Sequence, residues 1–173
     1  FGDAGPYMER SHEVVRVKTL PLAVPEIQEL GIHLKNWQQV KKIHLAASNT
    51  GGLQWIVDKK VKGDQQLIET ALGRSYRLSP GAFWQVHKNA ANTLASEVLT
   101  MTQAVGFKDS ADNLDLYGGA GLFAGSLATV FGDEINLTLV EASPVAASDA
   151  KRNLADLKNV KVVATGTEAF LRK

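Results

Sequence analysis

The hydrophobic positions of the chain follow two different periods, and the change falls near residue 80. Before that point, most apolar residues lie in short runs separated by Gly, Pro, Asn and Asp, which is typical of strands in an antiparallel sheet. Val24 to Leu34 differs, because its apolar residues recur at helical spacing and Pro25 fits a first helical turn. The predicted strands lie within His12–Thr19, Val40–Ser48, Leu53–Asp58, Gln66–Glu69 and Arg74–Leu78, with residues 49–52 as a hairpin turn.

After residue 80, helical periods alternate with short apolar strands. A helix of about five turns is predicted first, with Val86, Ala90, Leu94, Val98, Met101 and Val105 on its buried face. Strands are then predicted at 113–117, 136–140 and 160–164, separated by a helix at 122–130 and a helix from Pro144 that carries Ala146, Ala150, Leu154 and Leu157 on its buried side. Ser143 is suited to cap the second of these helices. This order predicts parallel pairing with right-handed crossovers.

The two periods predict an α/β chain in which a mixed, largely antiparallel α+β subdomain precedes a partial Rossmann-like sheet. We expect a tail or linker over residues 1–10, the α+β subdomain over 11–80, and the parallel part over 81–173, with the boundary near 79–86. Three parallel strands are fewer than the roughly five or six of a complete sheet of this type. An exposed strand edge is therefore expected, through which the chain could self-associate.

The most informative stretch joins the first parallel strand to the second. Tyr117 ends the first strand, and a side-chain-poor turn containing Gly119 and Gly121 leads directly into a helix. Glycines there let a ligand approach the N-terminus of the helix closely. Glu141 ends the second strand and follows Gly121 by 20 residues, close to the roughly 20 residues at which an acid reaches a ribose hydroxyl in such units. The stretch predicts an adenosine-containing ligand, although the glycines alone fit NAD as well as other adenosine cofactors.

Composition narrows the class of protein. The 173 residues are 45% hydrophobic and 21% charged, as in folded domains rather than disordered chains. No apolar run reaches the ~20 residues of a membrane span, and the N-terminus lacks the features of a signal peptide, so we expect a cytoplasmic protein with no membrane partner. The chain has no cysteine, which excludes a thiolate metal site, an iron–sulfur cluster and a cysteine nucleophile within it. It begins without Met, which we interpret as a sign of a fragment or a processed product.

The net charge of +1 means that nucleic-acid affinity needs a local basic patch. Six lysines supply one in the antiparallel part: Lys35, Lys41, Lys42, Lys59, Lys60 and Lys62. Such residues either form a solvated face or bind the backbone of RNA.

Two segments together resemble the S-adenosylmethionine-dependent RNA (uracil-C5) methyltransferases. The segment from Gly81 to His87 is similar to the family's F-x-Q-V-N motif, and the segment from Leu114 to Phe123 is similar to its L-D-L-Y-C-G-x-G-x-F motif. Glu141, Ala150 and Asn153 match an E…A…N pattern that follows the second strand in the family. The resemblance covers residues 10 to 170 and implies a class I methyltransferase sheet.

The resemblance implies that five residues bind S-adenosylmethionine: Gln85, Tyr117, Gly119, Gly121 and Glu141. Gln85 is expected near the methionine end of the cofactor, since an amide both donates and accepts hydrogen bonds. Glu141 is expected to accept from the ribose. No metal is expected.

The sequence also departs from the family's pattern. Gly118 replaces a cysteine, Leu122 replaces a polar residue, and Glu168 stands near, but not at, the position of an adenine-binding acid. Leu20 replaces the first cysteine found in iron–sulfur members. The nucleophilic cysteine and the general base of the family follow a D-P-P-R segment, which this chain lacks.

The resulting hypothesis is a fragment of an enzyme that methylates C5 of a uridine in rRNA or tRNA, with no catalytic residue in the fragment and no turnover by it alone. Two alternatives remain open from the sequence. One is an NAD(P)-binding oxidoreductase domain, and the other is a non-enzymatic RNA-binding module with a vestigial cofactor fold.

Overall fold

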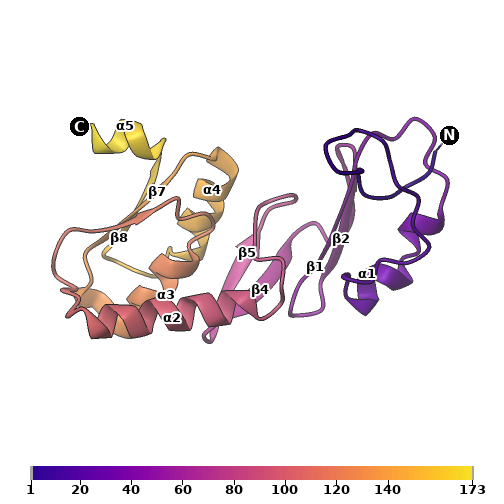
Figure 1. The fold of residues 1–173 in the computed structure, drawn as a ribbon. Helices are drawn as coiled ribbons and strands as arrows, with labels where there is room; N and C mark the ends of the chain where they lie inside the picture. Colours follow the sequence, from indigo (N-terminus) through magenta and orange to yellow (C-terminus); the bar gives the residue numbers. More distant parts are fainter. Residues whose placement is uncertain (1, 173) are drawn as a thin grey trace. The chain divides into compact units, whose positions relative to one another are not determined.

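In the computed structural model, which describes residues 2–172, the chain divides into two compact units between Gln65 and Gln66. Figure 1 traces both units from the N-terminus to the C-terminus. Residues 1 and 173, the outermost residues of the predicted tail and of the predicted second domain, lie outside this description. No helix formed by residues 2–172 has the length and apolar character that crossing a membrane requires.

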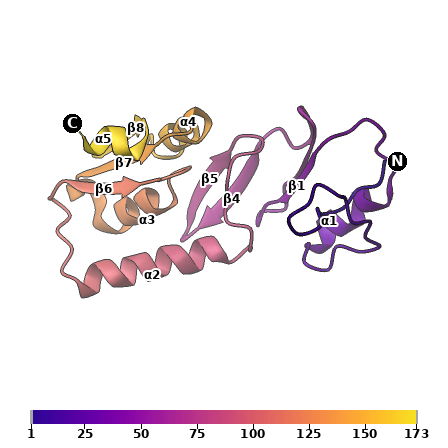
Figure 2. The same cartoon turned by 45° about the horizontal axis from the view of Figure 1, so that its top comes forward.

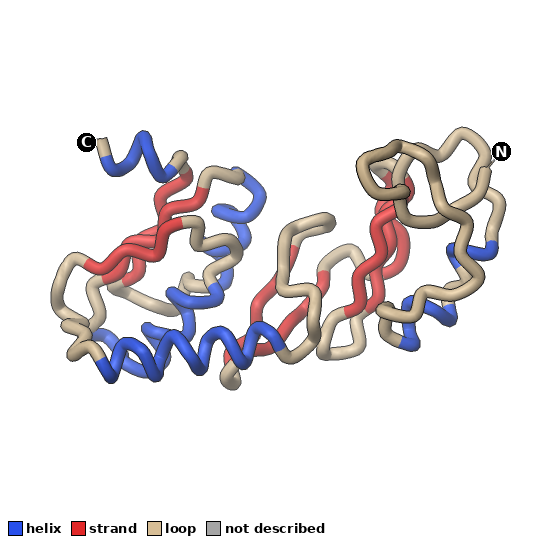
Figure 3. The backbone as a smooth tube through the Cα atoms, viewed as in Figure 1, coloured by secondary structure: helices blue, strands red, loops and turns tan. Residues whose placement is uncertain are grey.

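The first unit contains a three-stranded antiparallel sheet in the order β1-β2-β3 (Figure 3). Its elements are α1 (Pro25–Glu29), the 3-10 helix η1 (Ile32–Leu34), β1 (Ile43–Ala47), β2 (Leu53–Val57) and β3 (Lys60–Gly63). The predicted hairpin is confirmed as β1 and β2, which pair Leu45 with Trp55. The predicted helix over Val24–Leu34 is shorter, because Gly31 has a left-handed backbone with φ of 59° that separates α1 from η1. Strand β3 was not predicted, since a lysine-rich run lacks an apolar alternation.

The strand predicted within His12–Thr19 is wrong. Only an isolated bridge between Tyr7 and Val14 forms in this region. The segment folds back on residues 6–8, with Val15 N donating to Pro6 O at 2.8 Å. Valines favour strands only where a neighbouring strand offers pairing and burial, and here Val14 and Val15 stay exposed.

Within the described residues, the second unit combines a hairpin, a parallel sheet, four α-helices and one 3-10 helix, η2. Its elements are β4 (Leu67–Ala71), β5 (Arg74–Leu78), α2 (Ala90–Ala104), β6 (Asn113–Leu116), α3 (Leu122–Phe131), η2 (Gly132–Glu134), β7 (Leu137–Glu141), α4 (Pro144–Asn153), β8 (Val160–Ala164) and α5 (Thr167–Leu171). Strands β6, β7 and β8 pair in parallel in that order. The predicted alternation of strands and helices is thus confirmed, including the cap of α4, where Ser143 Oγ accepts from Ala146 N.

The core of the second unit lies between the parallel sheet and the helices. Leu137 and Leu139 of β7 contribute to one hydrophobic cluster with Ala124 and Leu127 of α3 and with Leu154, the residue that follows α4. Helix α3 lies between the sheet and α2, as Figure 2 shows. Burial of this apolar surface, at roughly 25 cal/mol per Å², stabilises the packing of α3 against the sheet.

The buried face predicted for α2 is wrong in part, since among its members Val98 is half-buried and packs against the hydrophobic cluster as predicted. The helix buries Ala91 and Ala95, whereas Leu94, Met101 and Val105 are 39%, 61% and 77% exposed. Val86, also assigned to that face, precedes the helix and is exposed. Small side chains allow α2 to pack closely beside Tyr76 and Leu122, with which both alanines form a cluster. The close approach therefore selects the alanine face rather than the face with the largest residues.

The division between the units also differs from the predicted boundary at 79–86. The β4–β5 hairpin belongs to the second unit. The reason is a set of hydrogen bonds, described below, that join β5 to α3 and α4.

Candidate functional site

The turn after β6 has an unusual backbone. Tyr117, Gly119 and Gly121 have φ values of 61°, 55° and 98°, all in the left-handed region. Glycine tolerates this region, whereas a tyrosine there is uncommon and strained, a feature that is enriched at ligand-binding sites. Gly121 is the N-cap residue of α3. The turn therefore places Gly119 N and the N-terminus of α3 at the carboxyl edge of the sheet.

Glu141 reaches this turn from the end of β7. Its Oε2 accepts a hydrogen bond from Gly119 N at 3.0 Å, and its Oε1 accepts from Ser143 N at 2.6 Å. These two bonds hold the carboxylate against the glycine turn. Each oxygen keeps a further lone pair that can accept from a ligand hydroxyl. The predicted pairing of the turn with the acid is present in the structure.

The glycines of the turn differ in their surroundings. An added Cβ at Gly119 would meet no atom of the described residues within 4 Å, whereas one at Gly121 would lie 2.9 Å from Leu154 Cδ1. Gly118 is more restricted still, because its added Cβ would lie 2.3 Å from Leu139 Cγ. Packing thus leaves no room for a side chain at Gly118 or Gly121, while Gly119 leaves open space beside Glu141.

Asp115 is a buried acid that sequence reasoning did not select. It lies in β6, and its Oδ2 accepts a hydrogen bond from Ala124 N at 3.0 Å, within the first turn of α3. Burial raises the pKa of Asp115 to about 6; the hydrogen bond from Ala124 opposes this shift, and the nearby Glu141 carboxylate adds to it. Gly121, at the N-cap position of α3, has no side chain that could accept this hydrogen bond, and Asp115 accepts it instead.

Asn153 links the glycine turn to the hairpin. Its Nδ2 donates to Ala120 O at 3.0 Å and to Arg77 O at 3.1 Å, and its Oδ1 accepts from Arg77 N at 2.8 Å. One buried amide in α4 therefore satisfies both backbone groups of a β5 residue and one carbonyl of the turn. The sequence marked Asn153 only as part of a family pattern.

Asp149 makes a second link, one helical turn earlier on α4. Its side chain is fully buried and accepts from Ser79 N at 2.8 Å and from Ser79 Oγ at 2.6 Å. Arg152 donates to it from the same helix at 2.5 Å. Together, Asp149 and Asn153 attach the end of β5 to α4. Their four-residue spacing on one helix face was the signal available in the sequence, since polar residues seldom occupy a buried face without partners.

Gln85 lies in the segment between β5 and α2, half-buried, and forms no hydrogen bond with residues 2–172. The adjacent Trp84 packs on Tyr76 with ring centroids 5.2 Å apart. Tyr76 is fully buried, and its hydroxyl donates to Leu122 O at 3.2 Å, at the start of α3. The Gln85 segment is thus attached to the helix that the glycine turn opens, although no direct contact joins Gln85 to Glu141.

Other predicted positions have different surroundings. Tyr117 is 74% exposed beside the turn. Glu168 forms a 3.4 Å ion pair with Arg172 in exposed α5. Leu122, which replaces a polar residue of the family motif, is buried in the cluster with Tyr76. Trp84 packs into that cluster, whereas the neighbouring Phe83 is 72% exposed.

No group of three or more His, Cys, Asp and Glu side chains within the described residues could hold a metal ion. The site is therefore built from backbone amides, open space at Gly119 and one carboxylate. A glycine turn between a parallel strand and a helix, with an acid at the end of the next strand, is the arrangement typical of nucleotide-binding Rossmann-like units.

Comparison with known proteins extends this description. The chain is 32% identical, over 98% of its length, to an uncharacterized RNA methyltransferase of Streptomyces avermitilis, of which it spans 45%. It is 30% identical, over 98% of its length, to an uncharacterized RNA methyltransferase of Streptomyces coelicolor, of which it spans 43%. The predicted resemblance to RNA methyltransferases is confirmed by these relatives. The chain spans less than half of the length of either one. No protein-family model matches the chain.

A solved structure supports the fold. The tRNA (uracil-54, C5)-methyltransferase of Pyrococcus abyssi, solved in complex with S-adenosyl-L-homocysteine, aligns with 62% of this chain and 26% of its own, with a TM-score of 0.50 and 21% identity. At this identity the likeness concerns the fold alone, and it confirms the predicted Rossmann-like α/β fold class.

Proposed function

We propose that this chain is the part of an S-adenosylmethionine-dependent RNA methyltransferase that forms one wall of the cofactor site. The observation that supports this proposal most directly is the hydrogen bond that Gly119 N donates to Glu141 Oε2. It places an acceptor for ribose hydroxyls directly beside the only positive-φ glycine of the turn that has open space around it. The RNA methyltransferase relatives support the choice of a methyl donor over NAD(P).

The chemical groups around the glycine turn match those that S-adenosylmethionine would need. Glu141 accepts from the ribose, Gly119 and Gly121 let the adenosine half approach the start of α3, and exposed Tyr117 borders the turn. Gln85 supplies an amide, free of bonds to the described residues, for the methionine end. When bound, S-adenosylmethionine supplies the methyl group, and these residues hold and orient it.

Cofactor binding is tested by a nuclear magnetic resonance titration of the chain with S-adenosylhomocysteine. We expect amide shifts at Gly119, Ala120 and Gly121 and loss of these shifts in Glu141→Ala. Affinity should be weak, because three strands provide only part of a pocket; a micromolar or tighter Kd would contradict this. Shifts with NADH but not with S-adenosylhomocysteine would support the oxidoreductase alternative and overturn the proposal.

For the whole protein we propose methylation at C5 of a uridine in rRNA or tRNA. A thiolate that adds to C6 makes C5 nucleophilic toward the methyl group, and a base then removes the C5 proton. This chain has no cysteine and therefore cannot perform the addition by itself. The test uses the longer protein and RNA that carries tritium at uridine C5. Methylation at C5 releases tritium to water, whereas methylation at a ring nitrogen or a ribose oxygen retains it.

We also propose that the isolated chain self-associates. Strand β6 is an edge of the parallel sheet formed by the described residues, and its Leu114 side chain is 45% exposed. An edge strand with an exposed apolar residue favours pairing with another copy. Light scattering during gel filtration should show a concentration-dependent mass that Leu114→Lys lowers. A constant monomer mass would contradict this proposal without affecting cofactor binding.

A further inference from the structure

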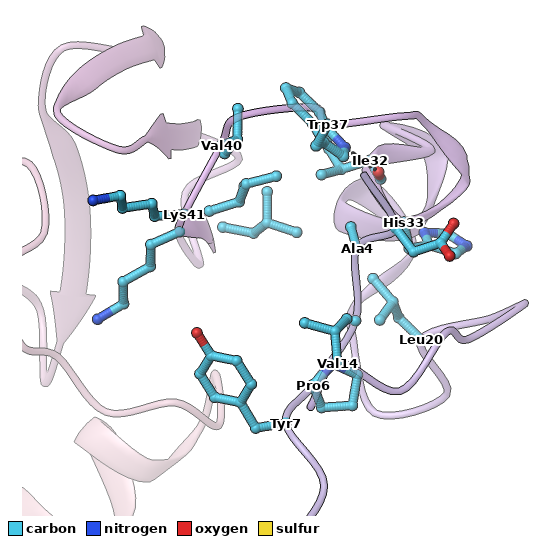
Figure 4. A pocket seen from close by; sticks show the side chains of 15 residues that line it. Ala4, Pro6, Tyr7, Val14, Leu20, Ile32, His33, Trp37, Val40 and Lys41 are labelled. Carbon is cyan, nitrogen blue, oxygen red and sulfur yellow. Dashed lines mark hydrogen bonds between the residues drawn. The ribbon is translucent and has the colours of Figure 1, made fainter. Parts of the chain in front are cut away.

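The first unit contains a cavity separate from the glycine-turn site. Its volume is about 330 Å³, at the lower end of the roughly 300–1,000 Å³ of small-molecule sites. Apolar side chains from β1 and from the N-terminal segment line much of it, including Ile43, Leu45, Val14 and Leu20. Figure 4 shows Tyr7 with its hydroxyl directed into the open side of the cavity and Trp37 on the opposite side.

Two lysines lie at one end of this cavity. Lys41 and Lys42 line it directly. Their backbone N–H groups both donate to Asp58 Oδ1, at 2.9 and 3.0 Å, which fixes the chain just before β1. The Asp58 carboxylate is the single acid between residues 35 and 62, against six lysines, so this segment has a net charge of +5 (six minus one).

Sheet register brings further lysines to the same end. Ile43, the first residue of β1, pairs with Val57, and Val57 pairs with Lys60 at the start of β3. Lys59 precedes Lys60 in the turn, and Lys62 lies opposite Trp55. Within the described residues, none of these lysine side chains forms an ion pair. Unpaired ammonium groups are available to an anionic partner.

We infer that this cavity and its lysines form a binding site for one nucleotide of single-stranded RNA. The base enters the apolar cavity against Tyr7, and the flanking phosphates contact Lys41 and Lys42. An aromatic ring beside a basic groove is the common arrangement for unpaired nucleotides, because every base has a face that stacks and every linkage carries a charge. Asp3 also lines the cavity, but its ion pair with Arg16 at 3.5 Å offsets its charge.

The inference rests on the proposed function for the choice of RNA, but it concerns a different unit of the chain. Lysines with no bidentate geometry recognise phosphate as point charges. The site therefore positions the RNA and does not by itself choose the uridine that is methylated.

The proposed phosphate contacts of Lys41 and Lys42 are tested by fluorescence anisotropy with a labelled single-stranded oligouridylate over a range of salt concentrations. The double variant K41A/K42A should bind about tenfold more weakly. Its slope of log affinity against log salt should be less steep by about 1.4, since each phosphate contact on a single strand contributes about 0.7. The matched control K108A/K161A removes two exposed lysines from the second unit and should keep the slope. Equal effects of the two double variants would overturn the inference.

The proposed binding of a base in the cavity is tested with an oligonucleotide of equal length and charge that lacks bases. The natural chain should prefer the oligouridylate at least about fivefold, and Tyr7→Ala should remove that preference. Tyr7 is 58% exposed, so its replacement should leave the fold intact, which circular dichroism checks. Equal binding of both oligonucleotides by the natural chain would exclude a base in the cavity. If S-adenosylhomocysteine causes the same amide shifts at Gly119 in each variant, the proposed cofactor site does not depend on the substituted residues of the first unit.

Discussion

The Asn153 side chain donates a hydrogen bond of 3.0 Å to the carbonyl oxygen of Ala120, at the centre of the glycine turn. The same amide bonds to both backbone groups of Arg77 in β5. The shape of the turn therefore depends on a residue from α4 and is coupled to the hairpin that leads to Gln85. We regard Asn153 as a positioning residue.

Asn153→Leu should destabilise the second unit by at least about 3 kcal/mol. The substitution leaves Arg77 N, Arg77 O and Ala120 O without their partner, and a buried unpaired polar group costs about 1–3 kcal/mol. Urea unfolding followed by fluorescence measures the change. Lys151→Ala, on the exposed side of the same helix, is the control and should alter stability by less than about 0.5 kcal/mol. A similar effect of both substitutions would contradict the role of Asn153.

Gly119→Ala and Gly121→Ala should separate ligand binding from folding. Both residues have positive φ, but only an alanine at Gly121 would clash with Leu154. We expect Gly119→Ala to cost about 1 kcal/mol of stability and to abolish the amide shifts caused by S-adenosylhomocysteine. Gly121→Ala should cost more stability than Gly119→Ala. If Gly119→Ala bound the ligand like the natural chain, the open space beside Gly119 would not be part of the site.

The raised pKa of Asp115 predicts that the folding stability depends on pH. Its pKa rises from 3.8 to about 6 on folding, so the folded chain binds more protons than the unfolded chain between these values. The contribution of Asp115 to folding stability is then largest below pH 4 and is lost as the pH rises through 6. Over the full titration the loss is on the order of 3 kcal/mol, because each tenfold difference in proton affinity between the folded and unfolded chain corresponds to about 1.4 kcal/mol.

The matched variant is Asp115→Asn, whose amide oxygen can still accept from Ala124 N but does not ionise. The difference in unfolding free energy between the variant and the natural chain should grow in favour of the variant from pH 4 to pH 6. Other titrating groups cancel in this difference. Parallel stability profiles would show that Asp115 has an ordinary pKa.

The close approach of Gly118 to Leu139 predicts that substitutions at these two positions will not have additive effects on stability. A side chain at residue 118 would lie against Leu139, which is fully buried. Gly118→Cys alone should destabilise the chain by about 1–3 kcal/mol through overpacking. Leu139→Ala alone should cost about 2–5 kcal/mol, but the double variant should lose less stability than the sum of the two single losses, because the added side chain fills the space that Leu139→Ala leaves. A double variant less stable than the sum of the two single variants would contradict the direct contact.

The sequence by itself determined the local and periodic features of this protein. The strands β1, β2 and β4 to β8 and the helix begun by Ser143 and Pro144 followed from short-range patterns. The spacing of Glu141 from Gly121 indicated its place beside the glycine turn. These patterns are readable because side-chain period and turn chemistry are set within a few residues. The strand expected at His12–Thr19 failed since pairing requires a partner that local propensity does not provide.

Only the tertiary structure decided how the hairpin, α4 and the glycine turn are joined. Asn153 bonds to Arg77 across 76 residues of sequence, and Asp149 bonds to Ser79 across 70. Hydrogen bonds between such distant residues leave no periodic trace in the chain. The buried face of α2 was likewise decided by close approach, which favours alanine over larger apolar residues. Contact geometry, rather than hydrophobicity along the sequence, therefore defines the frame around the candidate site.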